Sequence, residues 1–148
     1  QAEARQRVAP TRALAPATPY RALTPNRPEA AALLGGGAVD RDDDVEAAAR
    51  ALVVAGARAV LIKGGHANGD EVADLLFDGT AFVWLRGPRI ATPHTHGTGC
   101  SYAAAITARL AHGDALAVAV RIAHAWIARA IANAPGLGHG QGPIDHWA

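Results

Sequence analysis

The residues best suited to chemistry lie in one short stretch, His94-Thr95-His96-Gly97-Thr98-Gly99-Cys100, directly before a helical pattern. The N–H groups that begin a helix lack intrahelical partners and carry the positive end of its dipole. Glycines let a phosphate approach the backbone closely, so Gly97, Thr98 and Gly99 suit an anion-binding turn. The alternative is a tight turn in which Thr98 only caps the helix.

Cys100 is the single cysteine and falls in the first turn of that expected helix, where the dipole favours a thiolate. A base at this place could accept a proton from a substrate hydroxyl while the adjacent amides hold a transferring phosphoryl group. The alternative is a small buried side chain that only packs, as most free cysteines do.

Lys63 is the only lysine of the chain, against thirteen arginines, and it follows the apolar run of residues 59–62. A position that keeps lysine can require a compact and flexible positive charge. If the run is a buried parallel strand, Lys63 lies at the sheet edge where α/β proteins bind ligands. Its ammonium could neutralise nucleotide phosphates. The alternative is a lysine that extends from the strand end into solvent.

Asn26 and Glu29 follow another candidate strand, three residues apart, at the start of a helix pattern. Oxygen ligands of this type suit magnesium, often through water molecules. The same spacing also fits a capping box, with Asn26 as N-cap and Glu29 as its partner. The two interpretations are compatible.

Four histidines, His66, His94, His96 and His139, raise the question of zinc. No pair of them has the i, i+4 spacing of a helical zinc site, and there is no second cysteine to complete a ligand set. We therefore expect no zinc site.

The elements that must position these residues alternate between strand and helix, which indicates an α/β protein. Asp42-Asp43-Asp44 supplies an expected N-cap and negative charge at a helix start, Asp78-Gly79 indicates a hairpin, and Asp114 is the expected N-cap of the last helix. Strands are expected near residues 21–24, 59–63, 72–77 and 81–86. Helices are expected near residues 28–34, 42–55, 98–112 and 115–133.

The composition narrows the class of protein. Half of the residues are apolar and 18% are charged, which is typical of a globular chain. The formal charge of +1 gives no basis for nucleic acid as a partner, and no apolar run reaches the ~20 residues of a membrane span. A single cysteine suits a reducing cytoplasm. The absence of methionine indicates that the chain does not begin where translation began.

Four separated motifs together resemble the hydroxymethylpyrimidine/phosphomethylpyrimidine kinases of thiamine biosynthesis, which belong to the ribokinase-like superfamily. In order, they are Thr24-Pro-Asn-x-Pro-Glu29, Leu61-Ile-Lys-Gly-Gly-His66, His94 to Cys100, and Gly138-His-Gly-x-Gly-Pro143-x-x-His146. The resemblance implies that residues 21–148 are the C-terminal half of a three-layer α/β/α domain. Its sheet would be mixed, mostly parallel, with a terminal β-hairpin. Residues 1–20 would form an irregular N-terminal segment.

The resemblance also implies an activity and a set of site residues. The family uses ATP and Mg²⁺ to phosphorylate the hydroxymethyl group of the thiamine pyrimidine and then the monophosphate. By the resemblance, the residues Gly97-Thr98-Gly99 line an anion hole. Cys100 stands where most ribokinase-like enzymes place an aspartate, and is the candidate catalytic base.

The cofactor-binding residues come from the same resemblance. Lys63 and Thr95 are the expected contacts to ATP. Asn26 and Glu29 match the N-x-x-E motif of the superfamily and would organise magnesium, largely through water.

The N-terminal half of the family's domain, which contains the pyrimidine-binding segment, has no counterpart in this chain. We therefore expect an incomplete kinase domain that is inactive alone. In a full-length parent its partner would be a small-molecule substrate. That parent could also form a homodimer. Pyridoxal kinase-like activity is one alternative, because that enzyme shares the fold. A non-catalytic nucleotide-binding remnant is another.

Overall fold

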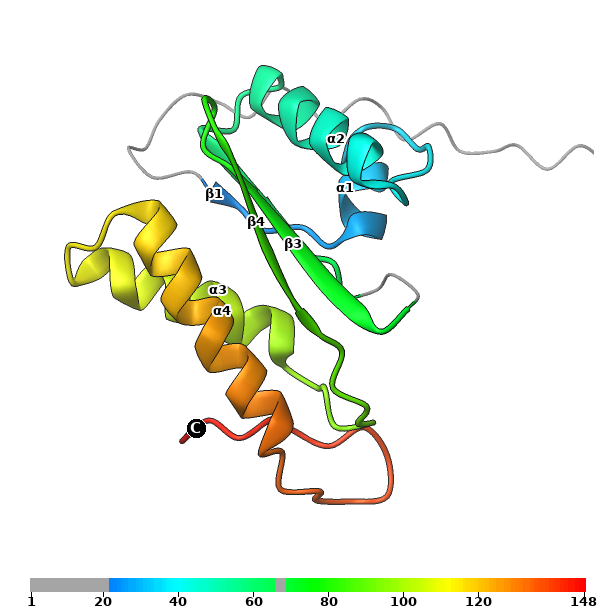
Figure 1. Cartoon of the computed structure of the whole chain (residues 1–148), viewed down its shortest axis with the longest axis vertical. Coiled ribbons are helices and arrows are strands. Elements are labelled where there is room, and N and C mark those ends of the chain that lie inside the picture. The colour runs from blue at the N-terminus through cyan, green and yellow to red at the C-terminus, as the bar shows by residue number, and fades with distance from the viewer. Residues whose placement is uncertain (1–21, 66–68) are drawn as a thin grey trace, which may run out of the picture. The chain divides into compact units, whose positions relative to one another are not determined.

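The computed structural model describes residues 22–65 and 69–148, which belong to two compact units (Figure 1). The first unit ends at Arg86 and the second covers Gly87–Ala148. The segment 1–20, expected to be irregular, lies outside the described residues, as does His66. Within the described ranges, no helix has the length and apolar character that crossing a membrane requires.

The first unit is a four-stranded sheet with two helices. Its strands lie in the order β1-β2-β3-β4; β1 runs parallel to β2, and β2 runs antiparallel to β3. The expected α/β class and mixed sheet are therefore confirmed, with element bounds close to the prediction. The elements are β1 (Ala22–Leu23), α1 (Arg27–Leu33), α2 (Asp42–Val54), β2 (Ala59–Ile62), β3 (Glu71–Phe77) and β4 (Phe82–Pro88).

Strand β2 is buried along its whole length, as its uninterrupted apolar sequence predicts. Val60 and Ile62 join the core that α2 covers, whereas Leu61 alternates to the opposite face because successive side chains of a strand point in opposite directions. Leu61 lies opposite Leu76 of β3, and both are 1% exposed. A strand buried in this way holds its carboxyl end, where Lys63 lies, in a fixed position.

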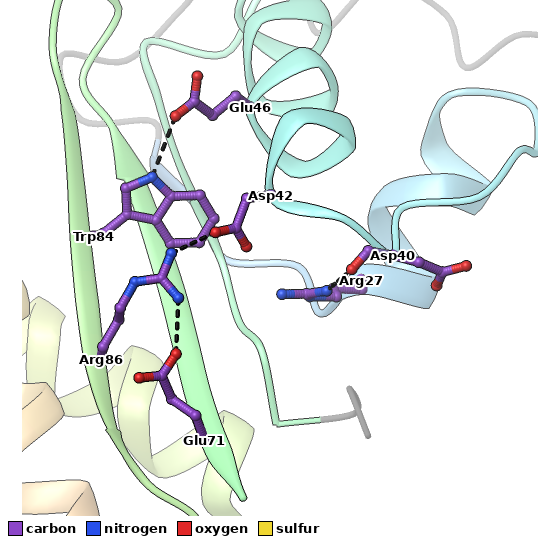
Figure 2. A network of polar contacts seen from close by, with 7 residues as sticks. All are labelled: Arg27, Asp40, Asp42, Glu46, Glu71, Trp84 and Arg86. Carbon is purple, nitrogen blue, oxygen red and sulfur yellow. Dashed lines mark hydrogen bonds and ion pairs between the residues drawn. The ribbon is translucent and has the colours of Figure 1, made fainter. Parts of the chain in front are cut away.

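A polar network joins helix α2 to strands β3 and β4 (Figure 2). The Trp84 indole N–H donates to Glu46 Oε1 at 3.2 Å, and the Arg86 guanidinium bonds Asp42 Oδ2 at 2.5 Å and Glu71 Oε2 at 2.8 Å. The guanidinium also lies 4.7 Å from the centre of the Trp84 ring. The acidic first turn of α2 is therefore tied to β4 by charge and ring contacts as well as by the apolar core.

The expected hairpin turn lies between β3 and β4. The Asp78 carboxylate accepts hydrogen bonds from the backbone N–H groups of Thr80 at 2.8 Å and Ala81 at 2.7 Å. These two donors, Ala81 more than Thr80, hold the pKa of Asp78 below its usual value. Gly79 takes a positive φ of 94°, which glycine adopts without strain.

The second unit pairs helix α3 (Thr98–Ala111) with helix α4 (Leu116–Ala132), and both match the predicted ranges closely. Two predicted N-caps were wrong. The N-cap of α2 is Arg41, and Asp42, Asp43 and Asp44 lie in the first turn of that helix. The N-cap of α4 is Ala115, and Asp114 makes no side-chain cap; its carboxylate instead lies 2.5 Å from Arg109 Nε. The Arg109 guanidinium thus pairs with the carboxylate that the local sequence pattern predicted to cap the helix.

Candidate functional site

The first group of candidate residues lies at the carboxyl ends of the parallel strands β1 and β2. Asn26 and Lys63 form a parallel bridge just beyond these strands, and the Lys63 N–H donates to the Pro25 carbonyl at 2.9 Å. Residues 37 positions apart are thereby brought side by side at the edge where open α/β sheets bind ligands. Lys63 is half-buried at this edge.

Asn26 and Glu29 form the capping box that was the alternative interpretation of their spacing. Asn26 Oδ1 accepts from the Glu29 N–H at 2.8 Å, and Glu29 Oε2 accepts from the Asn26 N–H at 2.8 Å. The cap uses Asn26 Oδ1 and Glu29 Oε2. The exposed Glu29 carboxylate therefore has a second oxygen that the cap does not use. This donor set fits magnesium held through water better than a closed direct ligand set.

A buried carboxylate beside this edge was missed by the sequence analysis. Asp74 of β3 is 4% exposed, and its Oδ1 accepts the Gly64 N–H at 2.7 Å. Gly64 itself has no room for a side chain, since a Cβ there would lie 2.2 Å from the Ala73 carbonyl oxygen. The signal available in the sequence was a charged residue inside the apolar strand Val72–Phe77. Asp74 and Gly64 together fix the turn that follows Lys63.

The second group of candidate residues forms the turn that begins α3. Gly97 is the N-cap, with a φ of 84°, and no side chain caps the helix. The first intrahelical bond runs from the Ser101 N–H to the Gly97 carbonyl at 2.9 Å, so the N–H groups of Gly99 and Cys100 precede it. Amides placed in this way form an anion-binding geometry.

Thr98 does not cap the helix, contrary to the alternative considered from sequence. It is the first helical residue, and its hydroxyl donates to the Thr95 carbonyl at 2.7 Å. Thr95 is exposed at the start of the turn. The hydroxyl bond therefore closes the turn itself rather than the helix end.

Cys100 lies in the first turn of α3, as predicted, and is exposed. The alternative of a buried packing residue is therefore wrong. An exposed sulfur beside the helix-start amides is open to a substrate that binds there.

The histidines in the described part of the chain do not gather around a metal position. His94 Nδ1 accepts the Gly142 N–H at 3.1 Å, which employs that ring nitrogen in holding the chain. Across the residues described, 22–65 and 69–148, no three His, Cys, Asp or Glu side chains form a candidate metal cluster.

The structure thus brings Asn26, Glu29 and Lys63 together in the first unit, and Thr95, Gly97-Thr98-Gly99 and Cys100 together in the second. From their motifs we expect Asn26, Lys63 and Cys100 to converge on one cleft, and this stays a prediction because Cys100 belongs to the other unit.

Comparison with known proteins agrees with the motifs. The chain is 47% identical over 128 residues to a hydroxymethylpyrimidine/phosphomethylpyrimidine kinase from Bacillus subtilis, covering 86% of this chain and 47% of that protein. It is 47% identical over 131 residues to the protein of the same name from Haemophilus influenzae, covering 85% and 48%. The chain therefore spans about half the length of these relatives.

A solved structure shows the same fold. The pyridoxal kinase from Staphylococcus aureus in complex with AMP-PCP and pyridoxal superposes with a TM-score of 0.81 at 38% identity, over 85% of this chain and 47% of that one. The expected ribokinase-like α/β fold is confirmed by this likeness. A family model described as phosphomethylpyrimidine kinase matches residues 5–145, which is nearly the whole chain. The chain therefore belongs to the phosphomethylpyrimidine kinase family.

Proposed function

We propose that this chain is the phosphate-handling half of a cytoplasmic kinase that phosphorylates hydroxymethylpyrimidine and its monophosphate, using ATP and Mg²⁺, in thiamine biosynthesis. The observation that carries the proposal is the turn at the start of α3, where free helix-start amides adjoin an exposed Cys100. The identity of 47% to two kinases of that name supports the same substrate class.

Each candidate residue has a distinct part in this proposal. ATP supplies the γ-phosphoryl group when it is bound. The N–H groups of Gly99 and Cys100 stabilise negative charge on the phosphoryl oxygens, because they are fixed and point out of the helix. The Cys100 thiolate accepts the proton of the substrate hydroxyl. Thr95 holds the turn in shape through its carbonyl.

The first-unit residues act on the nucleotide side in this proposal. Lys63 places a single positive charge near the phosphates, on a strand end that burial makes rigid. Asn26 and Glu29 orient water around magnesium while capping α1.

Pyridoxal is the second candidate substrate. The TM-score of 0.81 to a pyridoxal kinase with pyridoxal bound favours it at the level of fold. Sequence identity is lower there, 38% against 47% for the pyrimidine kinases, so the pyrimidine remains the first proposal.

A chimera tests the proposal directly. Residues 21–148 of this chain would replace the aligned segment of the Bacillus subtilis relative, and ATP-dependent phosphorylation of hydroxymethylpyrimidine and of pyridoxal would be measured side by side. Because the relative supplies the pyrimidine-binding half, the chimera tests the phosphate-handling role of this segment, and we expect a kcat/KM for the pyrimidine close to that of the unaltered relative.

Two outcomes would decide against this assignment. A shift of preference toward pyridoxal relative to the unaltered relative would move the assignment to the second candidate. A folded chimera that binds nucleotide but phosphorylates neither substrate would show that the segment is a non-catalytic remnant.

A further inference from the structure

The fourth motif of the sequence, at residues 138–146, has no part in the proposed function, yet the structure gives it many contacts. After α4 the chain turns back, and its last residues meet the loop that precedes α3 (Figure 1). Pro143 forms a parallel bridge with His96, one residue before the N-cap of α3. The end of the chain therefore lies against the proposed phosphate-binding turn.

The contacts on the N-terminal side of the turn are made by the backbone of Gly142. The His96 N–H donates to the Gly142 carbonyl at 3.1 Å, and the Gly142 N–H donates to His94 Nδ1 at 3.1 Å. As the acceptor, Nδ1 carries no proton, which fixes the tautomer of neutral His94. A Cβ at Gly142 would lie 2.6 Å from Nδ1 and 2.7 Å from the Leu137 carbonyl oxygen. Glycine is thus required for this close approach.

The contact on the other side of the turn is a side-chain bond. His146 Nε2 lies 3.1 Å from Ser101 Oγ, and Ser101 directly follows Cys100. The segment is itself anchored, because Ile144 is 2% exposed and the Asp145 N–H donates to the Ala130 carbonyl of α4 at 2.9 Å. Residues 142–146 therefore hold both flanks of the turn from a fixed base.

The turn gains from such support, because the Thr98–Thr95 bond closes it but no side chain caps the helix that it begins. Gly97, with its positive φ, is the N-cap, and no side chain caps α3. Glycine has the widest backbone freedom of any residue. Amides that stabilise a phosphoryl group must be held close to one geometry, and a displacement of about 1 Å can cost about 10²-fold in rate.

We propose that residues 142–146 form a clamp that positions the Gly97–Cys100 turn, with His146 acting through Ser101 as a positioning residue. This inference rests on the proposed function for its catalytic consequence. Neither His146 nor Ser101 needs to touch a substrate, because the clamp acts by holding the Gly99 and Cys100 amides in place.

The test uses four forms of the 148-residue chain: wild type, His146→Ala, His146→Gln and His112→Ala. Glutamine can place a hydrogen-bonding group where Nε2 lies, so it should rescue the bond. His112 is an exposed histidine at the opposite end of α3 and serves as the matched control.

Amide hydrogen exchange in the chain alone is the first readout. In His146→Ala, exchange of the hydrogen-bonded Thr98 and Ser101 amides should be about tenfold faster, with amides in the middle of α4 unchanged. His146→Gln and His112→Ala should match wild type. Unchanged exchange at the turn, a loss of protection throughout both helices, or failure of glutamine to rescue would each overturn the clamp.

Kinetics in the chimera described above are the second readout. His146→Ala should lower kcat about 10- to 100-fold at saturating substrates, leave the KM for the pyrimidine within about twofold, and be rescued by glutamine. A normal kcat would overturn the catalytic consequence. If the wild-type chimera is inactive while exchange in His146→Ala still rises at the turn, the proposed function fails and the clamp stands.

Discussion

At the scale of single residues, Cys100 and Lys63 should affect the chimeric kinase in different ways. Cys100→Ala should lower turnover roughly 10²- to 10⁴-fold if the thiolate is the general base, with nucleotide affinity little changed because the helix-start amides remain. Lys63→Ala should weaken nucleotide binding and reduce turnover together, since it removes a phosphate contact. Steady-state kinetics with ATP and the pyrimidine varied in turn measure both effects.

Near-normal turnover of Cys100→Ala would show that Cys100 is not the general base. The assignment of the chain to its family would not be affected. Thr107→Ala supplies a control within α3, because its hydroxyl donates only to the Ala103 carbonyl of the same helix at 2.8 Å.

Two adjacent glycines provide a matched pair for stability. Gly64→Ala should lower the free energy of unfolding by about 1–3 kcal/mol, because its Cβ would meet the Ala73 carbonyl oxygen at 2.2 Å. Gly65→Ala has nothing within 4 Å of the new atom and should change stability by less than about 0.5 kcal/mol. Urea unfolding of both variants checks this. Equal effects would mean that the close contact at Gly64 does not constrain the turn after Lys63.

At the scale of elements, the β3–β4 hairpin should carry a pH-dependent part of the stability. Backbone donors lower the pKa of Asp78 in the folded chain, so its contribution is present above the unfolded value of 3.8 and is lost as the pH falls through the folded value. Asp78→Asn keeps an acceptor oxygen but does not titrate. Its deficit relative to wild type should be largest well above pH 3.8 and should shrink as the pH falls below that value.

Thermal unfolding of both forms across this pH range measures that difference. A deficit that is constant with pH would show that the charge of Asp78 is irrelevant and that only the shape of the turn matters.

At the scale of the whole molecule, the 148 residues alone should turn over substrate far more slowly than the chimera. The chain corresponds to 47% of the Bacillus subtilis relative, and phosphoryl transfer depends on two substrates held in position together. We expect a difference of at least about 10³-fold in an assay with ATP and hydroxymethylpyrimidine. Turnover within tenfold of that of the chimera would show that the C-terminal half of the kinase domain is sufficient for activity.

Most elements, and the local placement of the candidate site residues on them, could be predicted from sequence, because their signals are local. The apolar run 59–62 indicated a strand buried on both faces, and the structure buries every residue of β2. The spacing of Asn26 and Glu29 predicted the capping box that begins α1. Gly97 and Cys100 were placed at a helix start by glycine and helix periodicity, and α3 begins there.

The tertiary structure decided the contacts between residues far apart in the chain. Asp74 reaches the Gly64 amide across ten residues, and His146 reaches Ser101 across 45. A nearer exception is Asp114, which local rules predict as the N-cap of α4 but whose carboxylate lies 2.5 Å from Arg109 Nε, five residues earlier. Helix and turn patterns arise from bonds within a few residues, so sequence determines them. Which carboxylate, amide or imidazole meets another depends on how the packed elements bring distant backbone together, and only the folded chain settles that.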